Sequence, residues 1–165
     1  MTIQDKISIA EFWSADHRFG IRLNLSHIRR MTLQCTRSYP NETGGILIGL
    51  YNSNYDCAEV TDIFCATRDS KKGKTWFLRG VHGLQNKLNE LWIRQKGYYL
   101  GEWHFHPGGT PIPSQIDMNQ MFSISSSSRV HCPEPTLIIF AGTNPIEGIS
   151  YRAYVFSKRK IFELA

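Results

Sequence analysis

The sequence predicts an α/β fold, in which a β-sheet is flanked by two or three helices. Short runs rich in β-branched and aromatic residues recur along the chain, and segments with helical spacing of their apolar residues interrupt them. Strands and helices that alternate in this way form an α/β sandwich or an α+β sheet. The chain has 165 residues and most simply forms one domain over 1–165, long enough to bury roughly two-thirds of its unfolded surface.

Four strands and one helix are expected in the first part of the chain. The strands are Ile7–Trp13, Phe19–Asn24, Gly44–Tyr51 and Ala58–Ala66. The first has the apolar content of a strand, the second alternates apolar and polar residues, and the last two are rich in β-formers. The turn-like Asn52–Asn54 predicts that the last two form a hairpin. Ser26 is a typical capping residue and predicts a helix from there to about Arg37.

Two helices and three strands are expected in the remainder. The helices are Val81–Lys96 and Ser114 to about Ile124, and the strands are Tyr98–His106, Thr136–Ala141 and Ile149–Ser157. Five apolar residues recur at helical spacing in the first helix, with polar residues between them. They are Val81, Leu84, Leu88, Leu91 and Trp92. Gly97 is expected to end this helix, and Ser125–Ser128 after the second helix is predicted to be a mobile loop.

The composition is that of a folded protein. Hydrophobic residues make up 41% of the chain and charged residues 20%, which argues against disorder. No apolar run approaches the roughly 20 residues that cross a bilayer, and the first residues lack the pattern of a secretory signal. A cytoplasmic protein without a membrane segment is therefore expected. The four cysteines form no C-x-x-C pair, so buried thiols are expected. They are Cys35, Cys57, Cys65 and Cys132.

The positive charge of the chain is moderate and dispersed. The formal net charge is +5, which permits an acidic partner such as nucleic acid but does not require one. Positive residues concentrate in Arg68–Lys74 and Lys158–Lys160. Solvated loops are the favoured interpretation of both, because charge runs alone carry little specificity.

The segment from His104 to Asp117 reads HFHPGGTPIPSQID. On a strand, side chains alternate between two faces, so His104 and His106 point the same way, roughly 7 Å apart. Phe105 points to the other face, where a core residue belongs. The glycines and prolines then turn the chain, and a helix that begins near Ser114 would bring Asp117 back to the histidines. Two imidazole nitrogens and one carboxylate oxygen leave the fourth position of tetrahedral zinc open, as in catalytic sites.

Each part of this segment also has a purely structural interpretation. Isolated histidines are more often core or surface residues than ligands. Ser-x-x-Asp is a common helix start, in which Ser114 caps the helix and Asp117 lies in the first turn. Capping does not account for two histidines on one face, and it is compatible with a metal site. The combined spacing is therefore much more specific than its parts.

The pattern His-x-His, seven residues, then Ser-x-x-Asp resembles the JAMM motif of the MPN-positive metalloproteases. That family also carries an upstream glutamate, and Glu42, which opens Glu42–Gly49 (ETGGILIG), matches its place. The resemblance covers about Glu42 to Asp117 and implies the MPN fold, a curved mixed β-sheet sandwiched by helices. Glu42–Gly49 and Tyr99–Pro107 (YLGEWHFHP) look most like the small bacterial deubiquitinase-like isopeptidases of CBASS anti-phage operons.

This resemblance implies an activity and a role for each site residue. One zinc ion per chain would be held by His104, His106 and Asp117, would lower the pKa of its bound water to about 7 and would polarise the scissile carbonyl. Glu42 would be the general base that passes the proton to the leaving lysine amine. Ser114 would donate to the oxyanion. The substrate would be a protein conjugate that carries the C-terminus of a cyclic nucleotidyltransferase, and neither nucleic acid nor a membrane would be required.

Two other residues compete for roles at this site. Glu102 lies on the histidine face, two residues before His104, and is the main rival of Glu42 as the base. Acceptance of a hydrogen bond from a ligand histidine is the more plausible role of Glu102, with a salt bridge as its structural alternative. His131 could be imagined as a further ligand, but an ordinary histidine is favoured.

A groove beside the metal would be needed to hold an extended peptide, for which strand addition at a sheet edge is one mode. Trp76, Phe77 and Ser125–Ser128 are candidates to flank it, although a place in the core is favoured for the two aromatics. Two other functions stay open. RadC-type members of the superfamily share a similar core and are associated with DNA, and metal-free MPN scaffolds serve as assembly partners. The ETGG strand argues against the first and the complete ligand set against the second, so an isopeptidase is favoured.

Overall fold

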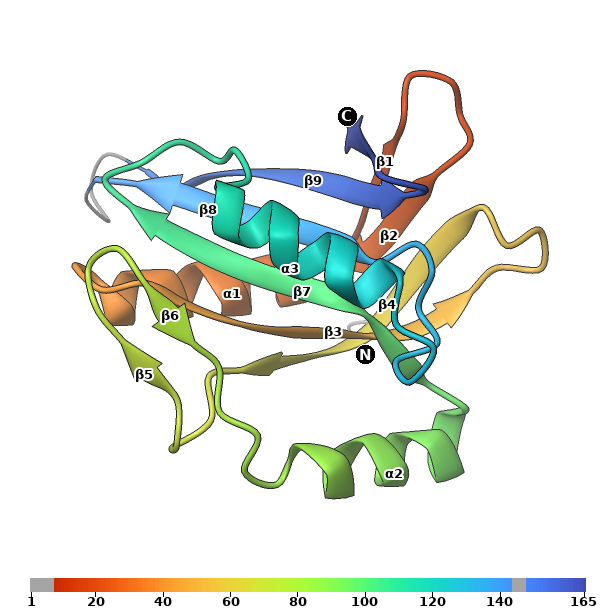
Figure 1. Cartoon of the computed structure of the whole chain (residues 1–165), viewed down its shortest axis with the longest axis horizontal. Helices are drawn as coiled ribbons and strands as arrows, with labels where there is room; N and C mark the ends of the chain where they lie inside the picture. Colours follow the sequence, from red (N-terminus) through yellow and green to blue (C-terminus); the bar gives the residue numbers. More distant parts are fainter. Residues whose placement is uncertain (1–7, 144–147) are drawn as a thin grey trace, which may run out of the picture.

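The computed structural model describes residues 8–143 and 148–165, in which ten strands and three helices follow one another (Figure 1). Eight strands form one mixed sheet in the order β1-β2-β4-β3-β7-β8-β9-β10, and β5 pairs with β6 in a separate hairpin. The sheet strands are β1 (Ile9–Trp13), β2 (Gly20–Asn24), β3 (Thr43–Tyr51), β4 (Cys57–Cys65), β7 (Tyr98–Pro107), β8 (Thr136–Gly142), β9 (Ser150–Ser157) and β10 (Lys160–Leu164). The hairpin strands are β5 (Lys71–Lys72) and β6 (Phe77–Leu78), and the helices are α1 (Leu25–Ser38), α2 (Leu84–Gln95) and α3 (Gln115–Ser125).

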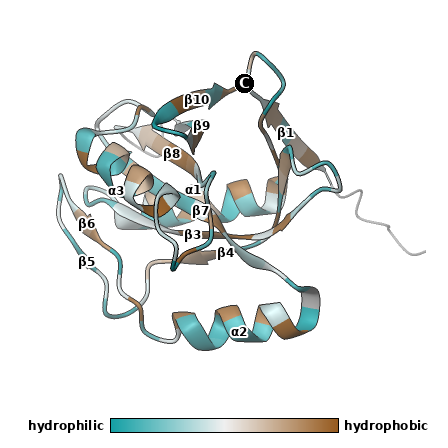
Figure 2. Ribbon diagram, turned by 45° about the vertical axis from the view of Figure 1, so that its right-hand side comes forward, coloured by the Kyte–Doolittle hydropathy of each residue, from teal (hydrophilic) through white to brown (hydrophobic). Residues whose placement is uncertain are grey.

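Apolar side chains cover both faces of the sheet. Figure 2 shows hydrophobic residues along the strands and a mixture of hydrophobic and hydrophilic residues along the helices. The inner face carries the main core, to which α1 contributes Met31 and Cys35. Helices α2 and α3 pack on the outer face. Strand β3 serves both layers, because Ile46 and Ile48 lie under α2 whereas Leu47 between them belongs to the inner core.

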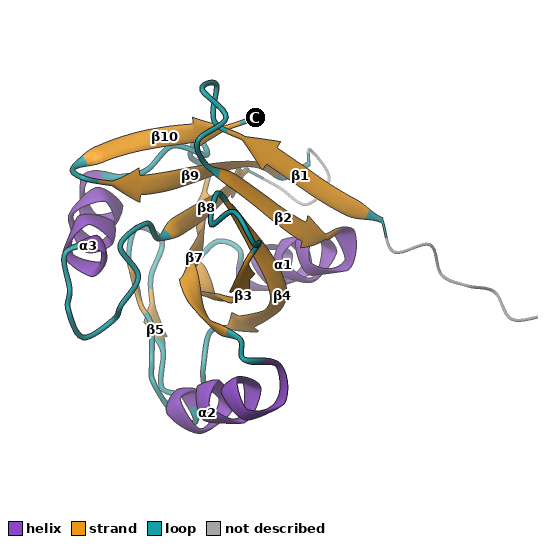
Figure 3. Cartoon of the chain, turned by 90° about the vertical axis from the view of Figure 1, so that its right-hand side faces the viewer, coloured by secondary structure: helices purple, strands orange, loops and turns teal. Residues whose placement is uncertain are grey.

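The sheet curves until its two edges meet (Figure 3). Strands β2 and β4 run parallel, as do β7 and β8, and the other neighbours are antiparallel. The edges β1 and β10 are joined by a bridge between Ser14 and Leu164, and Trp13 and Ala165 exchange two backbone N–H···O bonds of 3.0 Å. This contact nearly closes the sheet into a barrel and protects edges that would otherwise be unpaired. The predicted curved mixed sheet with flanking helices is confirmed.

Helix α1 is capped by a different residue from the one predicted. The side-chain oxygen of Asn24 accepts the backbone N–H of Ser26 at 2.8 Å, so Asn24 is the N-cap and Ser26 lies inside the first turn. Both residue types cap helices well, and the pattern alone does not distinguish them. Helix α3 has Ser114 as its N-cap, as predicted, but extends to Ser125, so the serine run begins inside the helix.

Helix α2 is shorter than predicted. Gly83 adopts a left-handed φ of 73°, and Val81 before it lies outside the helix with 68% of its surface exposed. At the other end Lys96, not Gly97, takes the left-handed conformation, with φ 59°. Only part of the predicted apolar stripe packs against the sheet, since Trp92 is 51% exposed. The stripe residues that do pack are Leu84, Leu88 and Leu91.

The predicted β3–β4 hairpin is confirmed, but the sequence pattern misses strands β5, β6 and β10. Two of these have only two residues, too few to show a period. Both basic segments predicted as loops contain strand residues. Arg68–Lys74 contains β5, and in Lys158–Lys160 the first two residues form the turn between β9 and β10 with positive φ and the third begins β10. Ile7, the predicted start of the first strand, lies outside the described residues.

The cysteines are free thiols, and all but the half-buried Cys65 are buried. Burial raises the pKa of Cys57 to about 11 and that of Cys132 to about 12, so these thiols are poor nucleophiles at neutral pH. The expectation of packed thiols agrees with these positions. Among the described residues, no helix is long and apolar enough to cross a membrane.

Candidate active site

Strand β7 places both motif histidines on the outer face of the sheet. Trp103 and Phe105 belong to the inner core and are at most 1% exposed, so strand alternation puts Glu102, His104 and His106 on the opposite face. The two imidazoles are largely covered there, with 12% and 16% of the side chain exposed. As predicted, the histidines share a face and Phe105 lies in the core.

The first turn of α3 brings Asp117 to the histidines. The Ser114 hydroxyl oxygen accepts the Asp117 backbone N–H at 3.1 Å, and Asp117 Oδ2 accepts the Ser114 backbone N–H at 2.7 Å. This capping box fixes the carboxylate. Asp117 Oδ1 lies 2.6 Å from His104 Nδ1, and Oδ2 lies 3.2 Å from His106 Nε2. Ser-x-x-Asp therefore caps the helix and joins the histidines at the same time.

Glu42 reaches the same face from the start of β3. The register of β3 and β7 pairs Gly44 with His104, so Glu42, two residues earlier, is on that face next to His106. A β-carbon at Gly44 would lie 3.0 Å from Cδ2 of His104, and glycine leaves room for this ring. The Glu42 backbone N–H donates to the carbonyl of Gly73 at 2.8 Å, which ties it to the β5–β6 hairpin.

A cavity of about 190 Å³ joins these residues. It is lined by Glu42, Thr75, Trp76, Phe77, His104, His106, Ser114, Ile116, Asp117 and Gln120. The β5–β6 turn forms one wall and α3 another. Trp76 is 49% exposed, so the prediction that favoured a place in the core is wrong for this residue. It lies beside the site, as the alternative prediction had it. Phe77 is half-buried, with its ring edge-on to that of His104 at 6.4 Å between centroids. The Ser125–Ser128 run is not part of the lining.

Glu102 lies behind His104, away from the cavity. Its Oε2 is 3.0 Å from His104 Nε2 and accepts from Gln120 Nε2 at 2.9 Å, and its Oε1 accepts from Arg79 Nη2 and from the Tyr99 hydroxyl, each at 3.3 Å. Glu102 is 1% exposed and does not line the cavity. The geometry agrees with a hydrogen bond to His104 and not with the role of general base.

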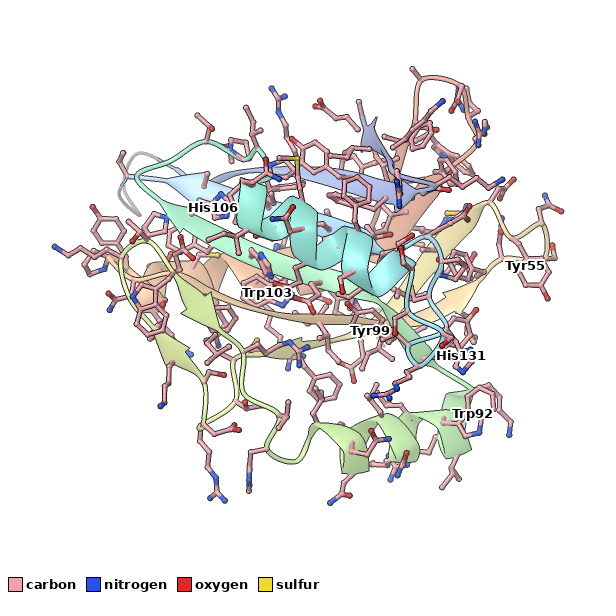
Figure 4. All side chains as sticks on the ribbon, viewed as in Figure 1. Tyr55, Trp92, Tyr99, Trp103, His106 and His131 are labelled. Carbon is pink, nitrogen blue, oxygen red and sulfur yellow. The ribbon has the colours of Figure 1, made fainter. Side chains whose placement is uncertain are left out.

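Sequence reasoning missed the partners of Glu102. Gln120 lies one helical turn after Asp117, and this spacing could have placed both on one face of α3. Arg79 and Tyr99 carry no such signal, because only the folded chain brings them to Glu102. His131 is exposed and lies at the opposite end of the molecule from His106 (Figure 4). This position agrees with the interpretation of His131 as an ordinary histidine.

Burial and mutual hydrogen bonds shift the pKa values of these groups. Burial alone would lower the pKa of His104, but its hydrogen bonds with Asp117 and Glu102 raise it to about 9. Burial would raise the pKa of the Asp117 carboxyl, but the hydrogen bonds from His104 and His106 hold it well below its usual range. For Glu42, burial dominates and raises the pKa of the carboxyl above its usual value, which makes it a better proton acceptor.

The three motif residues fit a divalent cation. One ligand atom each from His104, His106 and Asp117 lies within 4.8 Å of the others. Two imidazoles and one carboxylate are a typical donor set of catalytic zinc, although other divalent metals accept it too. His104 would bind through Nδ1, because Glu102 occupies its Nε2 side. The cavity that these residues line leaves space for a substrate group.

Zinc binding at pH 7 is expected to release about one proton per chain. His104, with its pKa of about 9, carries a proton that the metal must displace, whereas Asp117 is already ionised. Affinity should therefore increase with pH, by up to ~10-fold per unit, and level off above about pH 9. Calorimetric titration of metal-free protein in buffers of different protonation enthalpy measures the proton count. Binding without proton release would contradict this assignment.

The fold and the site define the class of protein. Residues 24–154 match the family model described as prokaryotic homologs of the JAB domain, and the chain belongs to this family. This match confirms the predicted resemblance, because the JAB domain is MPN-like.

Several curated relatives have one name, CD-NTase/cGAS isopeptidase. The protein of that name from Enterobacter hormaechei subsp. hoffmannii is 41% identical over 142 residues, which cover 86% of this chain and 76% of that protein. Its namesake from Escherichia coli is 33% identical over 108 residues, 64% of each chain. The Pseudomonas aeruginosa namesake is 28% identical over 142 residues, 81% of this chain and 85% of that one.

Solved structures show the same fold at low sequence identity. A solution structure of a Desulfitobacterium hafniense protein matches with a TM-score of 0.64 and 17% identity, over 86% of this chain and 87% of that one. A Salinibacter ruber protein matches with a TM-score of 0.57 and 16% identity, over 85% of each chain. At this identity the likeness concerns the fold alone.

Proposed function

We propose that this protein is a zinc-dependent isopeptidase, a hydrolase that cleaves the bond between the C-terminus of a conjugated protein and its target. The observation that carries the proposal is the half-buried Glu42 beside the group of His104, His106 and Asp117, all of which line one cavity. The names of the relatives support the same reaction. We assign the activity to residues 1–165 as one domain and place it in the cytoplasm.

Each site residue has a distinct task in this reaction. His104, His106 and Asp117 would hold the zinc, which when bound activates water and polarises a carbonyl. Glu42 would accept the proton of the attacking water and deliver it to the leaving lysine amine. The Ser114 hydroxyl oxygen already accepts an N–H bond, so its hydrogen is free to donate to the oxyanion.

The proposed substrate is a conjugate that carries the C-terminus of a cyclic nucleotidyltransferase of a CBASS operon. Its support is the name of the relatives, CD-NTase/cGAS isopeptidase, and one of them is 41% identical over most of this chain. The cavity supports a protein substrate in a second way. Its walls carry exposed apolar residues, Trp76 and Ile116, with 49% and 71% of their surface accessible, and such side chains suit contact with a peptide.

Incubation of zinc-loaded protein with nucleotidyltransferase conjugates is expected to release the free nucleotidyltransferase with its native C-terminal residue. Mass spectrometry of the products identifies the bond, and the same protein should leave DNA and RNA intact. Metal-dependent cleavage of nucleic acid with the conjugates left whole would replace this proposal by the RadC-like alternative. Zinc-loaded protein that cleaves neither would point to a non-catalytic scaffold.

A further inference from the structure

Arg79 approaches the candidate metal site from the side of the hairpin. It follows β6 directly in the chain, and its Nη2 donates to Glu102 Oε1 at 3.3 Å. The other carboxylate oxygen, Oε2, faces His104 Nε2 at 3.0 Å. Arg79 therefore lies two contacts away from the ligand atom Nδ1 of His104.

The carboxylate of Glu102 depends on this arginine. Glu102 is 1% exposed, and a buried carboxylate needs both a countercharge and hydrogen-bond donors. Besides His104, Arg79 is the only cation with which Glu102 forms an ion pair among the described residues. A metal-binding imidazole usually donates its other N–H to an acceptor that fixes the ring. Arg79 thus holds the acceptor that fixes His104.

A purely stabilising role does not fit Arg79. Its Nε and Nη1 atoms are buried and have no hydrogen-bond partner in the described part of the chain. Unpaired buried donors are unfavourable, and buried ion pairs add little stability compared with apolar residues of similar volume. Replacement of both residues by apolar side chains would therefore cost little stability, although removal of Arg79 alone would leave Glu102 without its countercharge.

We propose that Arg79 is a positioning residue of the metal site, which fixes the Glu102 carboxylate and through it the orientation of the His104 imidazole. This inference rests on the proposed function, because it presupposes that His104 binds a metal. It also connects two parts of the site. Only Leu78 separates the segment Thr75–Phe77, which walls the cavity, from the residue that orients a ligand.

The test is the zinc dissociation constant of Arg79→Met, measured by competition with a chelating dye. Loss of the charge with most of the side-chain length kept is expected to weaken zinc binding by roughly 10–100-fold. The metal-free variant should be less stable than wild type, because Glu102 loses a buried partner, so zinc affinity is compared under conditions in which urea unfolding shows both proteins to be folded. Arg152→Met is the matched control, because Arg152 pairs with Glu163 at 3.0 Å on the exposed surface, and it should bind zinc like wild type.

A double-mutant comparison shows whether Arg79 acts through Glu102. In the Glu102→Gln background, Arg79→Met should change zinc affinity no further, because the carboxylate it holds is absent. An equal loss in both backgrounds, or wild-type affinity in Arg79→Met, would overturn the inference. In the latter case wild-type protein that still binds zinc and cleaves conjugates keeps the proposed function. Wild-type protein without zinc affinity would overturn the proposed function and this inference together.

A conservative variant decides the question if Arg79→Met does not fold. Arg79→Lys keeps the charge but lacks the planar donor fork, and it is expected to bind zinc more weakly than wild type. A loss that disappears in the Glu102→Gln background supports the inference. Wild-type zinc affinity in Arg79→Lys would overturn the inference.

Discussion

Glu42→Gln is expected to slow conjugate hydrolysis by at least ~10²-fold while zinc binding and folding stay intact. The substitution keeps the size of the side chain but removes the oxygen that accepts a proton. Zinc should remain because the ligand group consists of His104, His106 and Asp117, and Glu42 is not part of it. The measurements are the hydrolysis rate at saturating zinc, the zinc content, and the urea midpoint.

Two comparisons make this result specific to the base. Glu163→Gln removes an exposed carboxylate that pairs with Arg152 and should hydrolyse conjugates at the wild-type rate. Glu102→Gln should weaken zinc binding by roughly 10–100-fold and recover most of its activity in excess zinc. A wild-type rate in Glu42→Gln would refute the mechanism, and a rate loss that zinc restores would move Glu42 from proton transfer to metal binding.

His104→Ala is expected to lose nearly all bound zinc and all measurable hydrolysis. The change removes one of the three proposed ligands and leaves the carboxylates of Asp117 and Glu102 without the imidazole between them. Loss of one partner from a buried charge cluster typically costs about 3–5 kcal/mol, so the metal-free variant should also be less stable. Elemental analysis, hydrolysis assays and urea unfolding measure the three effects.

The matched control is His131→Ala, which removes an exposed histidine at the other end of the molecule. It should keep zinc, activity and stability. Chelation of the wild-type protein should abolish hydrolysis. Added zinc should restore hydrolysis in the wild-type protein but not produce it in the His104→Ala variant. Wild-type protein that hydrolyses conjugates after complete chelation would contradict the metal-dependent mechanism.

The ligand group could be predicted from the sequence because its geometry is local. Alternation along one strand puts His104 and His106 on one face, and Ser-x-x-Asp places Asp117 in the first turn of a helix. Only the loop between strand and helix had to bring the two parts together, and its glycines and prolines indicated a turn. The strands of the main sheet could also be predicted, since seven of the eight have clear sequence patterns of their own.

Other features depend on contacts between segments that are distant in the chain. Glu42 reaches the site because β3 and β7 pair in a register that puts Gly44 opposite His104, and packing of the whole sheet sets this register. Trp76 lies at the cavity because a hairpin of two-residue strands holds it there, too short for any period to reveal. Arg79 contacts Glu102 because it directly follows this hairpin in the chain.

The sequence by itself thus determined the type of fold, the three candidate ligands and the resemblance to a metalloprotease family, because each depends on spacing within one or two neighbouring elements. From the sequence, only that resemblance favours Glu42 over Glu102 as the base, and the tertiary structure places Glu42 at the cavity and Glu102 behind His104. Both are carboxylates near the same histidines, and only the direction from which each strand approaches separates a candidate base from a residue that orients a ligand.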